Sequence, residues 1–124
     1  MDSREFSAFR KKLNKTQQQL AQLLGASVKA IHSYEQGWRT IPVHAERQLL
    51  FLITRMNKKK GSAAPCWETK QCAEEDKKRC PAWEFDMGDL CWFINGTICE
   101  GTARNSWTEK MVLCRSCTVL ISRL

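Results

Sequence analysis

The residues best suited to chemistry are seven cysteines, all of them in the second half of the chain. Between neighbouring cysteines lie five, seven, ten, seven, fourteen and two residues. The last two cysteines form a C-x2-C pair, a spacing that directs both sulfurs toward one centre. One other cysteine precedes a proline, and two precede a tryptophan. The candidate metal ligands are Cys66, Cys72, Cys80, Cys91, Cys99, Cys114 and Cys117.

Several kinds of thiol chemistry fit this pattern. Disulfides fit poorly, because seven is an odd number and a cytoplasmic compartment keeps thiols reduced. Zinc would need an all-thiolate site, since both histidines, His32 and His44, lie in the first half. An iron–sulfur cluster accepts wide spacings and four thiolates, and a Cys-Pro dipeptide recurs in one ferredoxin pattern. We favour the cluster, with zinc, disulfides and free core thiols as the alternatives.

The stretch "LCWFINGTICEG" predicts a β-hairpin that carries two of these thiols. Asn95-Gly96 is a strong signal for a two-residue turn, because both residues tolerate positive φ. Such a turn pairs Trp92 with Cys99 and places Cys91 on the opposite face. We therefore expect that one of the two cysteines binds metal and that the other packs in the core, or that two separate sites exist.

Charge and composition divide the chain of 124 residues into two parts. The net charge is +7, with +8 in residues 1–65 and −1 in residues 66–124, and all cysteines lie in the second part. Such asymmetry suggests that the basic part binds a polyanion. The stretch "NKKKGSAAP" has the composition of a linker. We expect a DNA-binding domain at 1–57, a linker at 58–65 and a cysteine-rich domain at 66–124.

Four short helices are predicted in the basic part from apolar residues at helical spacing. Thr16, with Gln19 three residues later, predicts a capping box at the start of the second helix. Gly25 and Gly37 predict left-handed ends for the second and third helices. The four helices are expected at about 4–13, 16–24, 27–36 and 42–56.

The segment "TQQQLAQLLGASVKAIHSYEQG" resembles the phage-repressor-like (XRE) helix-turn-helix family. The matching residues are Thr16, Gln17, Leu20, Ala21, Leu24, Gly25, Ser27, Ile31, Tyr34, Glu35 and Gly37. The resemblance implies that the third helix enters the major groove of double-stranded DNA, commonly as a homodimer on paired half-sites. One departure is "IPVHAERQLLFLITRMN", which reads as one longer helix where simple repressors have two.

The same resemblance implies which residues contact DNA. Lys29 would reach guanine acceptors and Val28 a thymine methyl, while Gln17 would contact phosphate. Arg10 and Glu35 match a pair that ties the first helix to the end of the third. We read His32 as an exposed helix residue with no metal partner. The complete candidate DNA interface is Gln17, Ser27, Val28, Lys29, His32, Ser33, Trp38 and Arg39.

The second part resembles the two-CW cysteine-rich domain of bacterial regulators, over residues 66–117. The match rests on the two Cys-Trp dipeptides, the "GTxC" at 96–99 and the order of the cysteines. The resemblance supplies a domain name and leaves the ligand chemistry open. We therefore expect a mainly α helix-turn-helix bundle followed by a small cysteine-rich α+β domain that contains a β-hairpin.

Together these patterns predict a DNA-binding transcriptional regulator that senses a signal through thiolate-bound metal. The alternative is a helix-turn-helix module with a structural zinc or disulfides, controlled by a partner protein in the manner of an antitoxin. No nucleophile–base pair, carboxylate pair or phosphate loop is recognisable, so we do not expect an enzyme. No apolar run approaches the ~20 residues of a membrane span, and "MDSREFSAFRKK" lacks the apolar core of a secretion signal. We expect a cytoplasmic protein without membrane contact.

Overall fold

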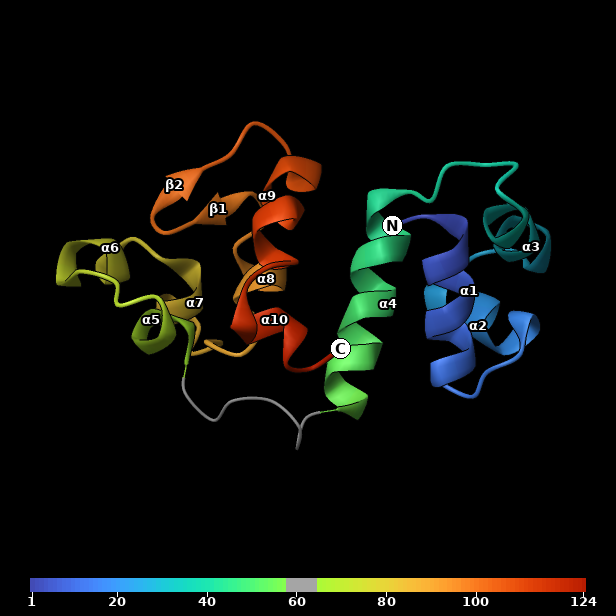
Figure 1. The fold of residues 1–124 in the computed structure, drawn as a ribbon, viewed down its shortest axis with the longest axis horizontal. Coiled ribbons are helices and arrows are strands. Elements are labelled where there is room, and N and C mark those ends of the chain that lie inside the picture. The colour runs from blue at the N-terminus through green and yellow to red at the C-terminus, as the bar shows by residue number, and fades with distance from the viewer. Residues whose placement is uncertain (58–64) are drawn as a thin grey trace. The chain divides into compact units, whose positions relative to one another are not determined.

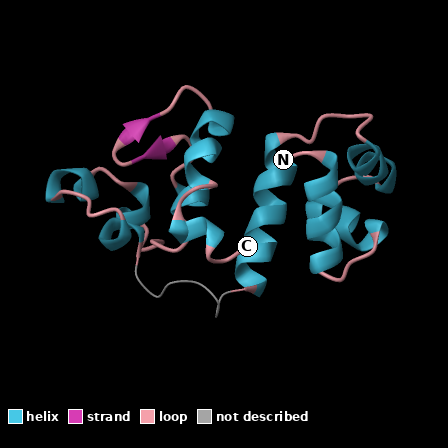
Figure 2. Ribbon diagram, in the orientation of Figure 1, coloured by secondary structure: helices cyan, strands magenta, loops and turns pink. Residues whose placement is uncertain are grey.

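The computed structural model describes residues 1–57 and 65–124. The chain divides into two compact units, Met1–Met56 and Asn57–Leu124. The expected fold class is confirmed, since the described residues are mostly helical and include one small antiparallel hairpin in the cysteine-rich unit (Figures 1 and 2). The predicted linker 58–65 lies, apart from Pro65, outside the described residues.

The first unit consists of four helices at the positions that the sequence predicts. Its caps also form as expected: Thr16 and Gln19 make a full capping box. Gly25 and Gly37 close their helices at φ values of 66° and 78°. A single long helix follows the third, as the departure from simple repressors indicated. The helices are α1 (Ser3–Lys12), α2 (Gln17–Leu24), α3 (Val28–Gln36) and α4 (Val43–Met56).

One apolar core holds these helices together. α1 packs against α3 and α4, and α2 packs against the same two helices (Figure 1). The ring of Phe6 meets the ring of Tyr34 edge-on, with centroids 5.7 Å apart. Fully buried side chains of this size each stabilise a fold by about 1.5–3 kcal/mol. The fully buried apolar residues that belong to α1, α2 and α3 are Phe6, Leu20 and Ile31.

The second unit is built from short helices and one hairpin. Cys66, Ala82 and Val119 form a small buried cluster, and Trp67 and Ile94 pack against it. None of the helices in the described ranges has the length and apolar composition that a membrane span requires. The elements are α5 (Cys66–Thr69), α6 (Glu74–Lys78), α7 (Pro81–Glu84), α8 (Cys91–Ile94), β1 (Ile98–Cys99), β2 (Thr102–Ala103), α9 (Trp107–Cys114) and α10 (Thr118–Ile121).

The hairpin does not turn at Asn95-Gly96, so that prediction is wrong. β1 pairs with β2 in the register Cys99↔Thr102, and the turn between them is Glu100-Gly101. These two turn residues have φ values of 53° and 76°, which a two-residue turn of type I′ requires at both positions. Asn95 instead ends α8, the helix that replaces the expected first strand.

Tertiary hydrogen bonds of Asn95 explain this difference. Its Oδ1 accepts from the backbone N–H of Ala82 at 2.9 Å, and its Nδ2 donates to Cys80 Sγ at 3.4 Å. Its own backbone N–H donates to the carbonyl of Cys91, which closes the turn of α8. The Asn95 side chain therefore ties α8 to α7, and the local turn signal is overridden.

Candidate nucleic-acid interface and thiol cavity

The N-cap and the first two turns of α3 present four of the predicted contact residues to solvent. Val28, Lys29 and His32 are exposed, as expected for the face of a recognition helix. Ser27 is the N-cap of α3, and its Oγ accepts from the N–H of Ala30 at 3.0 Å. This cap fixes the start of the helix, which is the part that reads base edges in helix-turn-helix proteins.

Ser33 was expected to be exposed on this face, and that expectation is wrong. The residue is buried, and its Oγ donates to the carbonyl of Lys29 at 2.9 Å. Ser33 lies five residues after Val28, so the helical period turns it toward the core while His32 stays outside. A buried hydroxyl that bonds its own helix does not reach a base, so we remove Ser33 from the candidate interface.

Two further candidates extend the exposed surface beyond the end of α3. Trp38 is 71% exposed, and its ring stands edge-on to the ring of His32 with centroids 5.4 Å apart. The guanidinium of Arg39 lies over the ring of Tyr34, with Cζ 5.7 Å from the centroid. Arg39 is therefore positioned by a cation–π contact while remaining available to an anion.

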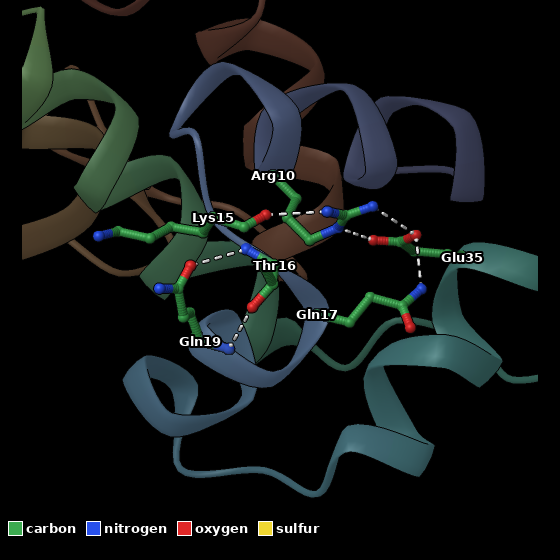
Figure 3. Close-up of polar contacts among 6 residues, drawn as sticks. All are labelled: Arg10, Lys15, Thr16, Gln17, Gln19 and Glu35. Atoms are coloured by element: carbon green, nitrogen blue, oxygen red, sulfur yellow. Dashed lines mark hydrogen bonds and ion pairs between the residues drawn. The ribbon is translucent and has the colours of Figure 1, made fainter.

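A polar network joins α2 and α3, which carry candidate contact residues, to α1 (Figure 3). Arg10 of α1 donates through Nε and Nη2 to the two carboxylate oxygens of Glu35 in α3, the second bond being 3.2 Å long. Its Nη1 donates to the carbonyl of Lys15 at 2.8 Å. From α2, Gln17 Nε2 donates to Glu35 Oε2 at 3.0 Å. The predicted Arg10–Glu35 pair is confirmed.

The network also explains the ionisation of Glu35. Burial by itself would raise the pKa of this carboxyl group, but hydrogen bonds from Arg10 and Gln17 and the charge of Arg10 bring it below the ordinary value. Glu35 is therefore ionised at neutral pH and holds Gln17 at the N-terminus of α2. This is where the family resemblance places a phosphate contact, so Glu35 orients a residue of the candidate interface.

In the second unit, all seven cysteines line one cavity of about 40 Å³. This is roughly three times the space that one water molecule needs. The cysteines come from five helices or their caps, one loop and one strand, so only the tertiary fold gathers them. All seven are free thiols. In the described part of the chain, no group of three or more His, Cys, Asp or Glu side chains is arranged to hold a single metal ion.

Cys91 and Cys99 both line this cavity, which overturns the expectation that they face opposite sides. That expectation assumed that the two residues lie on paired strands. In the structure Cys91 begins α8 and Cys99 ends β1. The helical turn rotates Cys91 toward the same space as Cys99, so both are candidate ligands.

Four of the thiols in this cavity are harder to ionise than free cysteine. A hydrogen bond with Cys66, followed by burial, raises the pKa of Cys91. Burial raises the pKa of Cys114 to about 11, and it also raises the pKa values of Cys72 and Cys99. Metal binding must therefore displace protons, as it does wherever thiolates are the ligands.

Five polar or charged residues at the cavity, besides the cysteines, were not anticipated from the sequence. They are Lys70, Asp76, Asn95, Glu100 and Lys110. For Lys110 a signal was present: with Trp107, Met111 and Cys114 it falls on one helical stripe, and all four are buried. The position of a lysine on the inward stripe of a helix predicts that its side chain is buried.

Comparison with known proteins supports the assignment of the first unit. Residues 7–42 match a family model described as helix-turn-helix. The match includes all of α2 and α3, the pair that forms the motif. It does not reach the cysteine-rich unit, so the two-CW resemblance stays a prediction. No match was found among curated proteins or among solved structures.

Proposed function

We propose that this chain is a DNA-binding transcriptional regulator, which its helix-turn-helix match over residues 7–42 supports, and that it senses a signal through an iron–sulfur cluster in its cysteine-rich unit. The observation that supports the sensing part most directly is the convergence of seven thiols from separate elements on one cavity. In this proposal the protein acts in the cytoplasm as a homodimer on paired half-sites.

The reading of DNA falls to α3 and the residues that flank it. Val28, Lys29 and His32 lie on the exposed face, where a thymine methyl and guanine acceptors are within the reach of such side chains. Gln17 and Arg39 flank this face and contact phosphates, which fix the register of the helix in the groove. Sequence-independent attraction comes from the basic charge of residues 1–65.

The donor set at the cavity suits a cluster. The candidate metal ligands that line the cavity are the seven cysteine sulfurs and the carboxylates of Asp76 and Glu100, and no histidine lines it. Asn95 Nδ2 donates to Cys80 Sγ, and hydrogen bonds to ligand sulfur are among the factors that set the potential of a cluster. Trp67 packs against the cysteine-containing core and Trp92 is buried, which limits the access of water.

Signal transmission follows from the coupling of metal binding to folding. The second unit consists of very short helices, whose stability comes from tertiary contacts more than from their own hydrogen bonds. When bound, a cluster supplies one-electron redox chemistry and joins cysteines from several of these elements. Its loss would loosen the unit and so alter the geometry of the dimer on its half-sites.

The test is anaerobic purification of the full chain, followed by measurement of its visible spectrum and its iron and acid-labile sulfide content. We expect a brown protein with iron and sulfide bound in equal amounts. Cys117→Ser should lose both, while the exposed neighbour substitution Ser116→Ala should retain them. Duplexes selected from a random-sequence pool then report DNA affinity with and without the cluster. A colourless protein that contains zinc and binds DNA equally well in both redox states would contradict the sensing proposal and favour control by a partner protein.

A further inference from the structure

Lys110 occupies an unusual place for a lysine. It lies in the middle of α9 and is 1% exposed, which makes it one of the largest fully buried side chains of the described residues. Burying an ammonium group is costly unless its hydrogen bonds are satisfied and its charge is used. A structural unit as small as this one has little stability to spare for a buried charge without a purpose.

Three backbone carbonyls hold the ammonium group in place. Nζ donates to the oxygens of Gly96 at 2.7 Å, Trp92 at 2.9 Å and Cys91 at 3.3 Å. These acceptors belong to α8 and the loop that follows it. Three acceptors require three N–H groups, and only the protonated form of lysine carries three. Lys110 is therefore a cation whose position is fixed by the backbone around α8.

This cation lies at the wall of the thiol cavity. Its charge acts on three of the cysteines, lowering the pKa values of Cys91, Cys99 and Cys114 against the larger effects that raise them. Four thiolates around a cluster bring more negative charge than the cluster core balances. A fixed positive charge at such a site offsets that excess without any movement of the protein.

A second lysine at the same cavity provides a natural comparison. Lys70 also lines the cavity, and its charge lowers the pKa of Cys99 more than the charge of Lys110 does, but it is not among the main causes of the pKa shifts of Cys91 or Cys114. Its side chain is partly exposed, and its Nζ pairs with Glu100 at 3.3 Å. Water and the neighbouring carboxylate both screen its charge. Of these two lysines, Lys110 is the one whose charge acts on the thiols through buried, low-dielectric surroundings.

We propose that Lys110 is the fixed countercharge of the thiolate site, strengthening the retention of an anionic metal–thiolate group and raising its reduction potential. The inference rests on the proposed function, because it requires that the cysteines bind metal. Reduction adds one electron from an external reductant to the cluster and breaks no bond. The reduced cluster is the more negative state, so a nearby cation stabilises it more than the oxidised state.

The experiment compares Lys110→Met with Lys70→Met in the full chain, reconstituted without oxygen with ferrous iron and sulfide. Methionine keeps much of the length and apolar character of the lysine stem and removes the charge. At the midpoint potential of the unsubstituted protein, Lys110→Met should lower the ratio of reduced to oxidised cluster on the order of tenfold. For a one-electron couple this corresponds to about 59 mV. Lys70→Met should change the ratio less than about twofold.

Retention of metal against a chelator is the second measurement, and Lys110→Arg is a second variant at the same position. If Lys110→Met cannot hold the cluster, Lys110→Arg should restore retention, because it keeps the charge. Should the unsubstituted protein take up zinc alone, the iron–sulfur proposal fails and zinc retention becomes the readout for Lys110. A protein that binds no metal overturns both proposals. Normal binding with an unchanged potential and retention in Lys110→Met, or equal loss in the Met and Arg variants, overturns the role of Lys110 alone.

Discussion

Replacing Glu35 by alanine should destabilise the first unit by about 2–3 kcal/mol. The change removes both acceptors of Arg10 and the acceptor of Gln17. One hydrogen bond to a charged group contributes about 1.5–3 kcal/mol, and the three bonds of this network do not add, because they share one carboxylate and water replaces part of what its partly exposed partners lose. The Arg10 side chain is only 15% exposed. In Glu35→Ala the Arg10 guanidinium keeps its hydrogen bond to the carbonyl of Lys15. The loss of stability therefore stays below the 3–5 kcal/mol typical of breaking a fully buried ion pair.

Hydrogen–deuterium exchange of peptides from residues 1–56 in the full chain measures this loss in the first unit separately. If thermal unfolding of this unit is followed as well, a loss of about 2–3 kcal/mol in its unfolding free energy corresponds to a decrease in Tm of about 10–20 °C. Gln36→Ala is the matched control, because the neighbouring residue is exposed in the same helical turn. That substitution should change the stability by less than about 0.5 kcal/mol.

The dependence on pH separates the charge of Glu35 from its packing. The folded pKa of Glu35 lies below its ordinary value of 4.5, so the ion pair stabilises the fold above that value. This contribution disappears as the pH falls through the lowered pKa. The stability difference between the unsubstituted protein and Glu35→Gln should therefore be constant near neutral pH and vanish in acid. A double-mutant cycle with Arg10→Ala that shows simple additivity would refute the assignment of a coupled pair.

Two further predictions concern the recognition helix and the packing of the second unit. Lys29→Ala should relax base preference and weaken binding to the selected sequence by about 1–3 kcal/mol, while Gln17→Ala should weaken binding to all sequences alike. Fluorescence anisotropy on selected and random duplexes measures both effects. Unchanged affinity and preference for Lys29→Ala would rule out α3 as the reading element. Gly88→Ala should destabilise the second unit by about 1–3 kcal/mol, because its Cβ would lie 2.5 Å from Pro65 Cβ and 2.9 Å from Pro65 Cα. In Gly96→Ala the new Cβ would meet no atom within 4 Å, so only the φ of 59° adds strain, at a cost of about 1 kcal/mol. Equal losses of stability in denaturant titrations of the two variants would contradict the predicted clash at Gly88.

The first unit could be predicted almost completely from its sequence, because its signals are local. Thr16 and Gln19 lie three residues apart, and Gly25 and Gly37 act within one helical turn. The apolar spacing of α1 to α4 then leaves few ways to bury one core. Ser33 was the exception: the helical period places it beside the exposed face of α3 but on the side that packs against the other helices, so it is buried.

The second unit shows what a sequence leaves to tertiary structure. The sequence identified the seven cysteines as the chemical residues, since thiol chemistry depends on residue type. It misplaced the hairpin, because Asn95-Gly96 is a strong local turn signal and the bonds of Asn95 to Ala82 and Cys80 span 13 and 15 residues.

The shared cavity was likewise decided only by the fold. Its thiols extend in sequence from Cys66 to Cys117, with as many as fourteen residues between neighbouring cysteines, and they belong to elements too short to be stable alone. Lys110 is held at the cavity wall because carbonyls 14 to 19 residues away in sequence accept hydrogen bonds from its Nζ. Residue types and local spacing thus determined which groups can react, whereas long-range packing determined which of them meet, because contacts between distant residues leave no periodic pattern in a single sequence.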